Sequence, residues 1–150
     1  KSCARIHTSN MKWLVVGLCL YLIITRDGWC AISEKQLNAT KKLVRNSCTA
    51  KSKVAPEIID AMHQGDFSDG QCYLHCIMNT YKLIKPDGSF DWEGGITTVN
   101  ANAPPKIAVT AAASIKNCKD SLKNKSDKCA GAAEVAKCIY EDDPPNYFLP

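Results

Sequence analysis

The sequence predicts an all-α domain, a compact bundle of about six helices held together by disulfides. Apolar residues recur at helical spacing in six segments, which proline, glycine or polar residues separate. No segment alternates apolar and polar residues as a half-buried strand would, and no internal repeat is found. Six cysteines remain once the first 30 residues are set aside, and this even number suits three disulfides.

The first 30 residues have the pattern of a secretory signal peptide. Met11 offers a start, so residues 1–10 are interpreted as an upstream extension and residues 11–30 as the signal peptide. Lys12 precedes an apolar run at residues 13–24, which is too short for a membrane span of about 20 residues. Cleavage after Cys30 would release a domain at residues 31–150 with a C-terminal tail at 141–150. Nine cysteines in 150 residues also favour an oxidising compartment, so we expect a secreted, extracellular protein.

The charge balance of the domain argues against one class of partner. The chain has 19 basic and 15 acidic residues, and residues 1–30 hold four of the basic and one of the acidic ones. The domain is therefore left with a net charge of about +1. Binding to nucleic acid needs a basic surplus or a basic stripe, and neither is present. We therefore expect no nucleic-acid partner and no stable membrane insertion.

Two helices open the domain. Ser33 and Gln36 fit a capping box, so the first helix is expected to start there. Pro56 suits the first turn of a second, shorter helix, and Gly65 suits its C-terminal cap. The inward positions of the first helix are Leu37, Thr40, Val44 and Cys48, and those of the second are Ile58, Ile59 and Met62.

The segment at residues 71–85 organises the rest of the chain. Ser68 and Gln71 offer a capping box at its start, and Pro86 is expected to end the helix after residue 85. At about 100° per residue, Cys72 and Cys76 fall on one side of this helix. Apolar side chains occupy the opposite side: Leu74, Ile77, Met78, Tyr81 and Ile84. A surface helix has one apolar side, so the second side either packs in a core or lines an internal cavity.

The segments after this helix are less regular. Pro86, Asp87 and Gly88 form a predicted turn. Gly94 and Gly95 are expected to break the chain, which leaves a short helix at residues 96–103. Further helices are expected at residues 106–119 and from Ser126 or Asp127 to Tyr140, before an apolar tail at residues 146–150.

Helix geometry limits the disulfide pairing without deciding it. Cys72 and Cys76 are four residues apart on one helix, where their Cβ atoms are too far apart and too nearly parallel to bond. Cys129 and Cys138 lie on opposite faces of one helix, about 13.5 Å apart along its axis. Excluding both pairs leaves ten of the fifteen pairings that six cysteines allow.

The cysteine spacing resembles that of a known family. The pattern Cys48-x23-Cys72-x3-Cys76-x41-Cys118-x10-Cys129-x8-Cys138 is similar to that of the six-cysteine insect odorant-binding proteins, of the pheromone and general odorant-binding family. The resemblance extends over the whole domain. It implies the pairing Cys48–Cys76, Cys72–Cys129 and Cys118–Cys138, and a helical shell around an apolar cavity.

The resemblance also implies a function. The protein would bind small hydrophobic volatile or lipid-like molecules and carry them through aqueous fluid, with no cofactor, as a monomer or weak homodimer. An olfactory receptor is a further partner to consider. The helical pattern supplies these candidate ligand-binding residues: Met62, Leu74, Ile77, Met78, Tyr81, Ile84, Phe90, Ile115, Tyr147 and Phe148. We expect Tyr147 and Phe148 to fold back over the cavity mouth, the alternative being a frayed tail.

Other sites are less well supported. His63 and His75 are the histidines of the domain, but a zinc site wants four ligands and disulfide-bonded cysteines cannot serve. Without a Gly-x-Ser-x-Gly motif or a phospholipase His-Asp pair, we expect neither a metal site nor catalytic residues. Asn38 and Asn124 begin two glycosylation sequons.

Two carrier functions and one structural role remain open from the sequence. The protein could carry odorants or pheromones, or it could carry or scavenge another hydrophobic ligand in haemolymph, saliva or reproductive fluid. The pocket chemistry of these two would be the same. A purely structural disulfide protein is the third interpretation.

Overall fold

Six α-helices and one short 3-10 helix form the described part of this computed structural model, residues 33–147 and 149–150. The all-α prediction is confirmed, because the one β-type pairing among these residues is a single antiparallel bridge between Ile84 and Phe90. The predicted upstream extension, signal peptide and Phe148 lie outside the described residues. The helices are α2 (Glu34–Ser52), α3 (Pro56–His63), α4 (Gln71–Thr80), α5 (Trp92–Asn102), α6 (Pro105–Asn117), α7 (Lys128–Asp142) and η1 (Pro144–Asn146).

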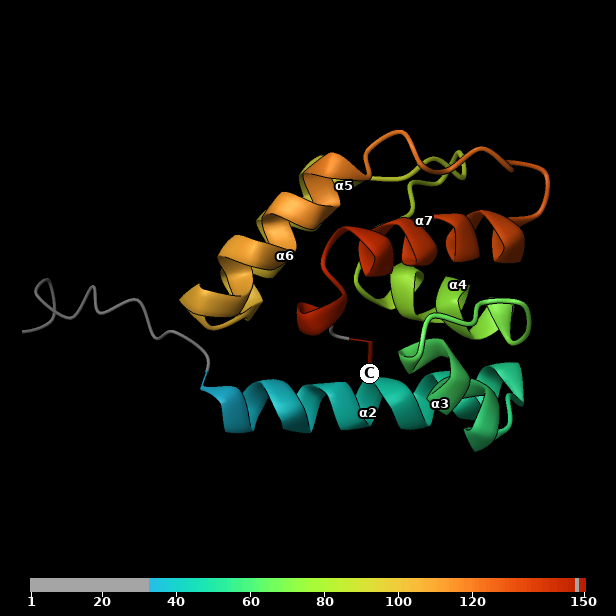
Figure 1. Cartoon of the computed structure of the whole chain (residues 1–150), viewed down its shortest axis with the longest axis horizontal. Coiled ribbons are helices and arrows are strands. Elements are labelled where there is room, and N and C mark those ends of the chain that lie inside the picture. Colours follow the sequence, from blue (N-terminus) through green and yellow to red (C-terminus); the bar gives the residue numbers. More distant parts are fainter. Residues whose placement is uncertain (1–32, 148) are drawn as a thin grey trace, which may run out of the picture. The chain divides into compact units, whose positions relative to one another are not determined.

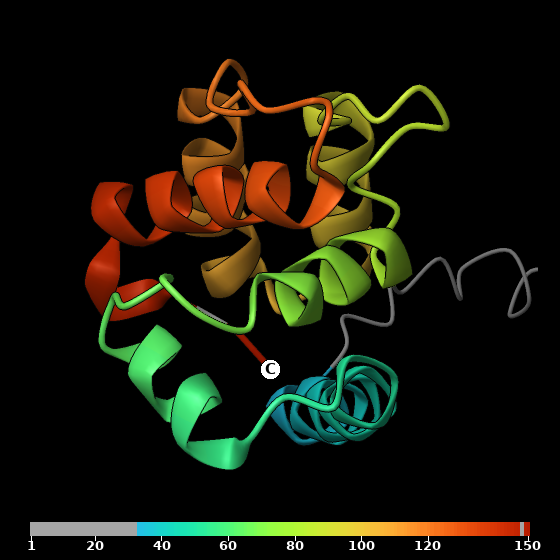
Figure 2. The same cartoon turned by 90° about the vertical axis from the view of Figure 1, so that its right-hand side faces the viewer.

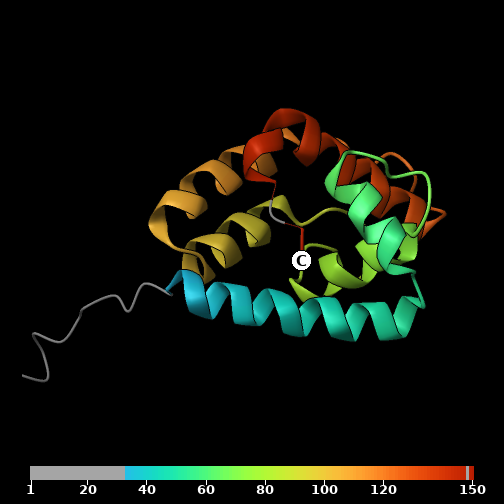
Figure 3. The ribbon, with the colours of Figure 1, turned by 60° about the horizontal axis from the view of Figure 1, so that its bottom comes forward.

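The helices enclose the end of the chain. The main helix pairs are α4 with α7, α5 with α6, and α2 with α4. In two perpendicular views the C-terminal residues lie between α2 and α7 (Figures 1 and 2). A third view shows the helices surrounding this segment (Figure 3). The tail is therefore part of the interior.

The first two helices begin at the residues that the local sequence predicts. The Ser33 hydroxyl accepts a hydrogen bond from the Gln36 amide at 3.3 Å, and the Gln36 side chain accepts one from the Ser33 amide at 2.9 Å. The predicted capping box is therefore confirmed. Pro56 begins α3, and Gly65 follows that helix with φ +89°, a conformation that favours glycine.

The predicted extent of the central helix is wrong at its C-terminal end, because α4 stops at Thr80 instead of residue 85. Lys82 takes a left-handed conformation, with φ 57°. The Leu83 carbonyl then accepts a hydrogen bond from the Asp91 amide at 2.8 Å. Pairing with the segment just before α5 thus replaces the last helical turn, and Ile84 leaves the α4 face.

The predicted Ser68–Gln71 capping box is also wrong. Gly70 is the N-cap residue of α4, at φ 66°, and no side chain caps the helix. The Ser68 hydroxyl donates instead to the Asp66 carboxylate at 2.7 Å. An added Cβ at Gly70 would lie 2.7 Å from Cγ2 of Ile58, so both the backbone conformation and the packing favour glycine.

The expected chain break at Gly94-Gly95 is wrong as well, because both glycines lie inside α5. The Asp91 carboxylate caps this helix by accepting a hydrogen bond from the Gly94 amide at 3.1 Å. A Cβ on Gly95 would lie 2.7 Å from Leu83. Gly95 therefore permits close packing here, a role that its sequence context does not reveal.

The three disulfides join Cys48 to Cys76, Cys72 to Cys129, and Cys118 to Cys138. This confirms the pairing that the family resemblance implies. The first two bonds tie α4 to α2 and to α7, and the third ties the end of α6 to α7. The two cysteines of the central helix are thus bonded to two different helices, because helix geometry keeps them from bonding to each other.

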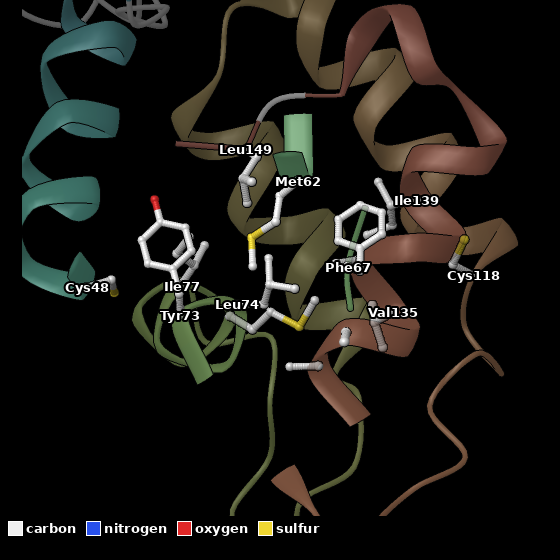
Figure 4. Packing of buried hydrophobic residues seen from close by; sticks show 14 of the residues in the cluster. Cys48, Met62, Phe67, Tyr73, Leu74, Ile77, Cys118, Val135, Ile139 and Leu149 are labelled. Atoms are coloured by element: carbon white, nitrogen blue, oxygen red, sulfur yellow. The ribbon is translucent and has the colours of Figure 1, made fainter. Parts of the chain in front are cut away.

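The core lies where α3, α4 and α7 meet the tail (Figure 4). Tyr73, Met62 and Val135 are fully buried there. Leu149 also points into this cluster and is 7% exposed. None of the described helices combines the length and hydropathy that a membrane span needs.

Candidate ligand-binding site

Two adjacent apolar cavities lie inside the helical frame, with volumes of about 60 Å³ and about 50 Å³. They share Tyr81 and Leu83, which follow the end of α4 and form the wall between them. The first cavity is lined by Leu37, Lys41, Tyr81, Leu83, Gly95, Thr98, Val99, Asn102, Ala103, Ile107 and Ile115. The second is lined by Leu74, Ile77, Met78, Tyr81, Leu83, Ala136, Ile139, Tyr147, Leu149 and Pro150.

The helix pairing explains the first cavity. Among the described helices, α2 packs chiefly on α4, and none of the main helix pairs joins it to α5 or α6. The N-terminal end of α2 nevertheless extends toward the α5–α6 end of the bundle (Figures 1 and 3). Side chains from α2, α5 and α6 therefore face a common space that no helix fills.

The second cavity lies against the apolar side of α4, the side for which the sequence left open a core or a cavity wall. Leu74, Ile77 and Met78 project from the side of α4 opposite its cysteines, and all three line this cavity. They are also buried among other core residues. The second side of α4 is thus both core and cavity wall.

The tail forms part of the wall of the second cavity. Leu149 and Pro150 are buried and form part of its lining. The Tyr147 ring packs edge-to-face on Tyr140 and Phe67, with ring centroids 5.3 Å and 6.0 Å apart. The tail is docked, which does not fit the frayed-tail alternative.

A buried hydrogen bond fixes the end of the tail. The Tyr73 hydroxyl donates to a main-chain oxygen of Pro150 at 2.7 Å. Burial raises the pKa of Tyr73 to about 12, so this hydroxyl stays a donor throughout the neutral range. Sequence reasoning missed Tyr73, although the residue lies at the edge of the apolar side of its helix.

The sequence-predicted residues divide between the cavities and the core. Five line the second cavity, and two, counting Tyr81 again, line the first. Met62 and Phe90 are buried core residues outside both linings. Ile84 borders a separate outer hollow with His75 and Lys85. The residues at the second cavity are Leu74, Ile77, Met78, Tyr81 and Tyr147, and those at the first are Tyr81 and Ile115.

Sequence reasoning missed most of the first cavity. Its walls on α2 and α5 are the side chains of Leu37, Lys41, Thr98, Val99 and Asn102. The α2 stripe that contains Leu37 gave no sign of a cavity, because a core stripe has the same spacing. The α5 residues were hidden because the glycine pair suggested a break where a helix runs.

Basic groups gather on the side of α2 that approaches α3. Arg45 pairs with Asp60 at 3.7 Å. Burial lowers the pKa of His63, and the nearby Arg45 and Lys41 charges lower it further. The Asp60 carboxylate opposes this lowering without cancelling it. Because the folded-state pKa of His63 lies below its value of about 6.5 in the unfolded chain, the free energy of unfolding should fall as the pH drops below about 6.5. No cluster of three or more potential metal ligands occurs within residues 33–147 and 149–150.

Replacing Tyr73 with Phe should loosen the tail. The change leaves the buried Pro150 oxygen without its donor, so the free energy of unfolding should fall by roughly 1–2 kcal/mol. Urea denaturation measures this loss, and limited proteolysis within residues 144–150 should become faster. Unchanged proteolysis would mean that aromatic packing alone holds the tail.

Known proteins share the sequence features and the fold of this chain. Residues 30–142 match the family model described as the PBP/GOBP family. The chain is similar to general odorant-binding protein 72 of Anopheles gambiae, with 26% identity over 79% of this chain and 99% of that protein.

Two solved structures share the fold. Odorant-binding protein 4 of Chrysopa pallens is 36% identical, with a TM-score of 0.71 over 79% of this chain and 99% of its own. Odorant-binding protein 5 of Apis mellifera is 28% identical, with a TM-score of 0.72 over 80% of this chain and 99% of its own. With the cysteine pairing, the helical frame and the family match in agreement, this chain belongs to the PBP/GOBP family.

Proposed function

We propose that this protein is a secreted carrier that binds small hydrophobic odorants and transports them through aqueous fluid. The observation that carries the proposal is the pair of adjacent apolar cavities inside a disulfide-bonded frame. Ligand pockets in proteins are mostly apolar and carry few polar groups, as both of these do. Delivery to an olfactory receptor and a monomeric or weakly dimeric state belong to the same proposal.

The relatives favour odorants over other hydrophobic cargo. They are named as odorant-binding proteins, and the chain matches nearly the full length of each of those reported above. The disulfides support secretion, because such bonds persist in oxidising compartments. Transport of other hydrophobic cargo outside olfaction would use the same cavities, but these relatives do not favour it.

Tryptophan substitutions inside the cavities should weaken ligand binding. Ile77→Trp would fill the second cavity and Val99→Trp the first, because both residues line those spaces. The wild-type protein should bind the fluorescent probe N-phenyl-1-naphthylamine with micromolar affinity, about −8 kcal/mol. Each variant should weaken this binding at least about tenfold, a loss of about 1.4 kcal/mol, and unlabelled odorants should displace the probe from the wild type.

Val109→Trp is the matched control, because Val109 is 71% exposed on α6 and contacts neither cavity. It should bind the probe like the wild type. Far-ultraviolet circular dichroism should be the same for all variants. Full probe binding by both cavity variants would contradict the proposal, and unfolding of Ile77→Trp alone would mean that this side of α4 serves as solid core.

A further inference from the structure

Tyr81 and Leu83 separate the two cavities, and they differ in how firmly they are held. The Leu83 amide donates to the Met78 carbonyl at 2.8 Å, and the Leu83 carbonyl accepts from the Asp91 amide at 2.8 Å. The Leu83 side chain packs so closely on Gly95 that an added Cβ there would lie 2.7 Å from it. Leu83 is therefore held by both its backbone and its side chain.

The Tyr81 ring has fewer restraints. Among the described residues no hydrogen bond involves its hydroxyl, whereas the Tyr73 hydroxyl donates to a Pro150 oxygen at 2.7 Å. Tyr81 also belongs to none of the aromatic pairs that hold the tail. It is half-buried and directly follows the end of α4. The ring can therefore change rotamer without breaking a hydrogen bond of its hydroxyl, and its movement would join the two cavities.

The size of the cavities shows why this movement matters. Their volumes are about 60 Å³ and about 50 Å³. An engineered protein cavity of about 150 Å³ holds benzene. Neither cavity has half of that space, and the two together still fall short of it. A larger ligand therefore needs both spaces, and the side chain between them that is least restrained has to move.

We propose that one ligand with an unbranched hydrocarbon chain occupies both cavities, and that the Tyr81 ring rotates to let the chain pass Leu83. This inference rests on the proposed carrier function and adds the shape of the ligand to it. The surface of both linings is almost wholly apolar, so the chain needs no polar partner along its path. A cyclic isomer is wider than the chain and would be excluded by the fixed Leu83 side chain. Tyr81 is thus a specificity-determining residue for chain shape.

The first experiment counts ligands. Isothermal titration calorimetry of the wild-type protein with 1-decanol should give one ligand per protein. Val99→Trp fills the first cavity and Ile77→Trp the second, so each variant alone should weaken 1-decanol binding at least about tenfold. Two separate sites would instead bind two molecules, and each variant would keep one of them at the wild-type affinity.

The second experiment tests Tyr81 with 1-decanol and cyclodecanol, which have the same number of carbon atoms and different shapes. In Tyr81→Ala, cyclodecanol should bind about tenfold more tightly than in the wild type, while 1-decanol should change less than about threefold. Comparing each ligand with itself removes the difference in their hydrophobicity. Tyr81→Leu should act in the same direction and serves if Tyr81→Ala does not fold. Leu43→Ala is the control and should change neither ligand, because Leu43 is 71% exposed and lies outside both linings.

The outcomes separate this inference from the carrier function. Two ligands per protein, or wild-type affinity for 1-decanol in either tryptophan variant, would overturn the inference and leave the carrier function intact. Unchanged affinity for cyclodecanol in the folded Tyr81 variants would overturn it as well. A wild-type protein that binds neither 1-decanol nor N-phenyl-1-naphthylamine would overturn the carrier function and this inference together.

Discussion

Removing the Cys72–Cys129 disulfide should lower the free energy of unfolding by roughly 4 kcal/mol. The bond closes a loop with a sequence separation of 57 residues, the longest of the three. In the chain-entropy description, a crosslink stabilises by restricting the unfolded chain, and the effect grows slowly with loop length. Because Cys72 is exposed, a serine there adds little cost of its own.

The measurement is urea denaturation of Cys72→Ser/Cys129→Ser, a double variant in which neither partner of the removed bond is left as a free thiol. In a separate thermal unfolding experiment, the melting temperature of this variant should fall by roughly 10–15 °C. The wild type under reducing conditions provides the comparison in which all three bonds are lost, and it should be less stable still. A loss below about 1 kcal/mol would show that packing of α4 on α7 suffices without the crosslink.

Gly65→Ala should cost roughly 3 kcal/mol, because two effects coincide at this position. Gly65 has φ +89°, where a side chain adds strain of about 1–2 kcal/mol. A Cβ there would also lie 2.5 Å from the Cε1 atom of Tyr140. Tyr140 packs on Phe67 and Tyr147, so displacing its ring should loosen the docked tail as well.

Gly88→Ala separates these two effects. Gly88 has a similar φ of +83°, but nothing lies within 4 Å of an added Cβ. Its cost should therefore be the backbone strain alone, about 1–2 kcal/mol. Thermal unfolding of both variants gives the difference, which reports the collision with Tyr140. Equal losses would mean that the Tyr140 ring moves aside freely.

The sequence determined the features that depend on neighbouring residues. The capping box at Ser33 and the helix start at Pro56 need only a few adjacent positions. The cysteine pattern identified the family, and through that resemblance it implied the disulfide pairing. Helix geometry alone left ten pairings open, because loop closure does not depend on local pattern. The apolar side of the predicted central helix also indicated four residues of the second cavity: Leu74, Ile77, Met78 and Tyr81.

The tertiary structure decided where the helices depart from the local sequence pattern and where the cavities form. The helical periodicity of residues 71–85 continues past Thr80, but pairing of Leu83 with Asp91 ends the helix there. Gly94 and Gly95 suggest a break, yet both lie inside α5, where the Asp91 carboxylate accepts a hydrogen bond from the Gly94 amide and Gly95 packs closely on Leu83. Lys41 joins the first cavity only because α2 passes the α5–α6 pair without packing on it. These outcomes depend on contacts between different segments of the chain, which the residue pattern of any one segment does not encode.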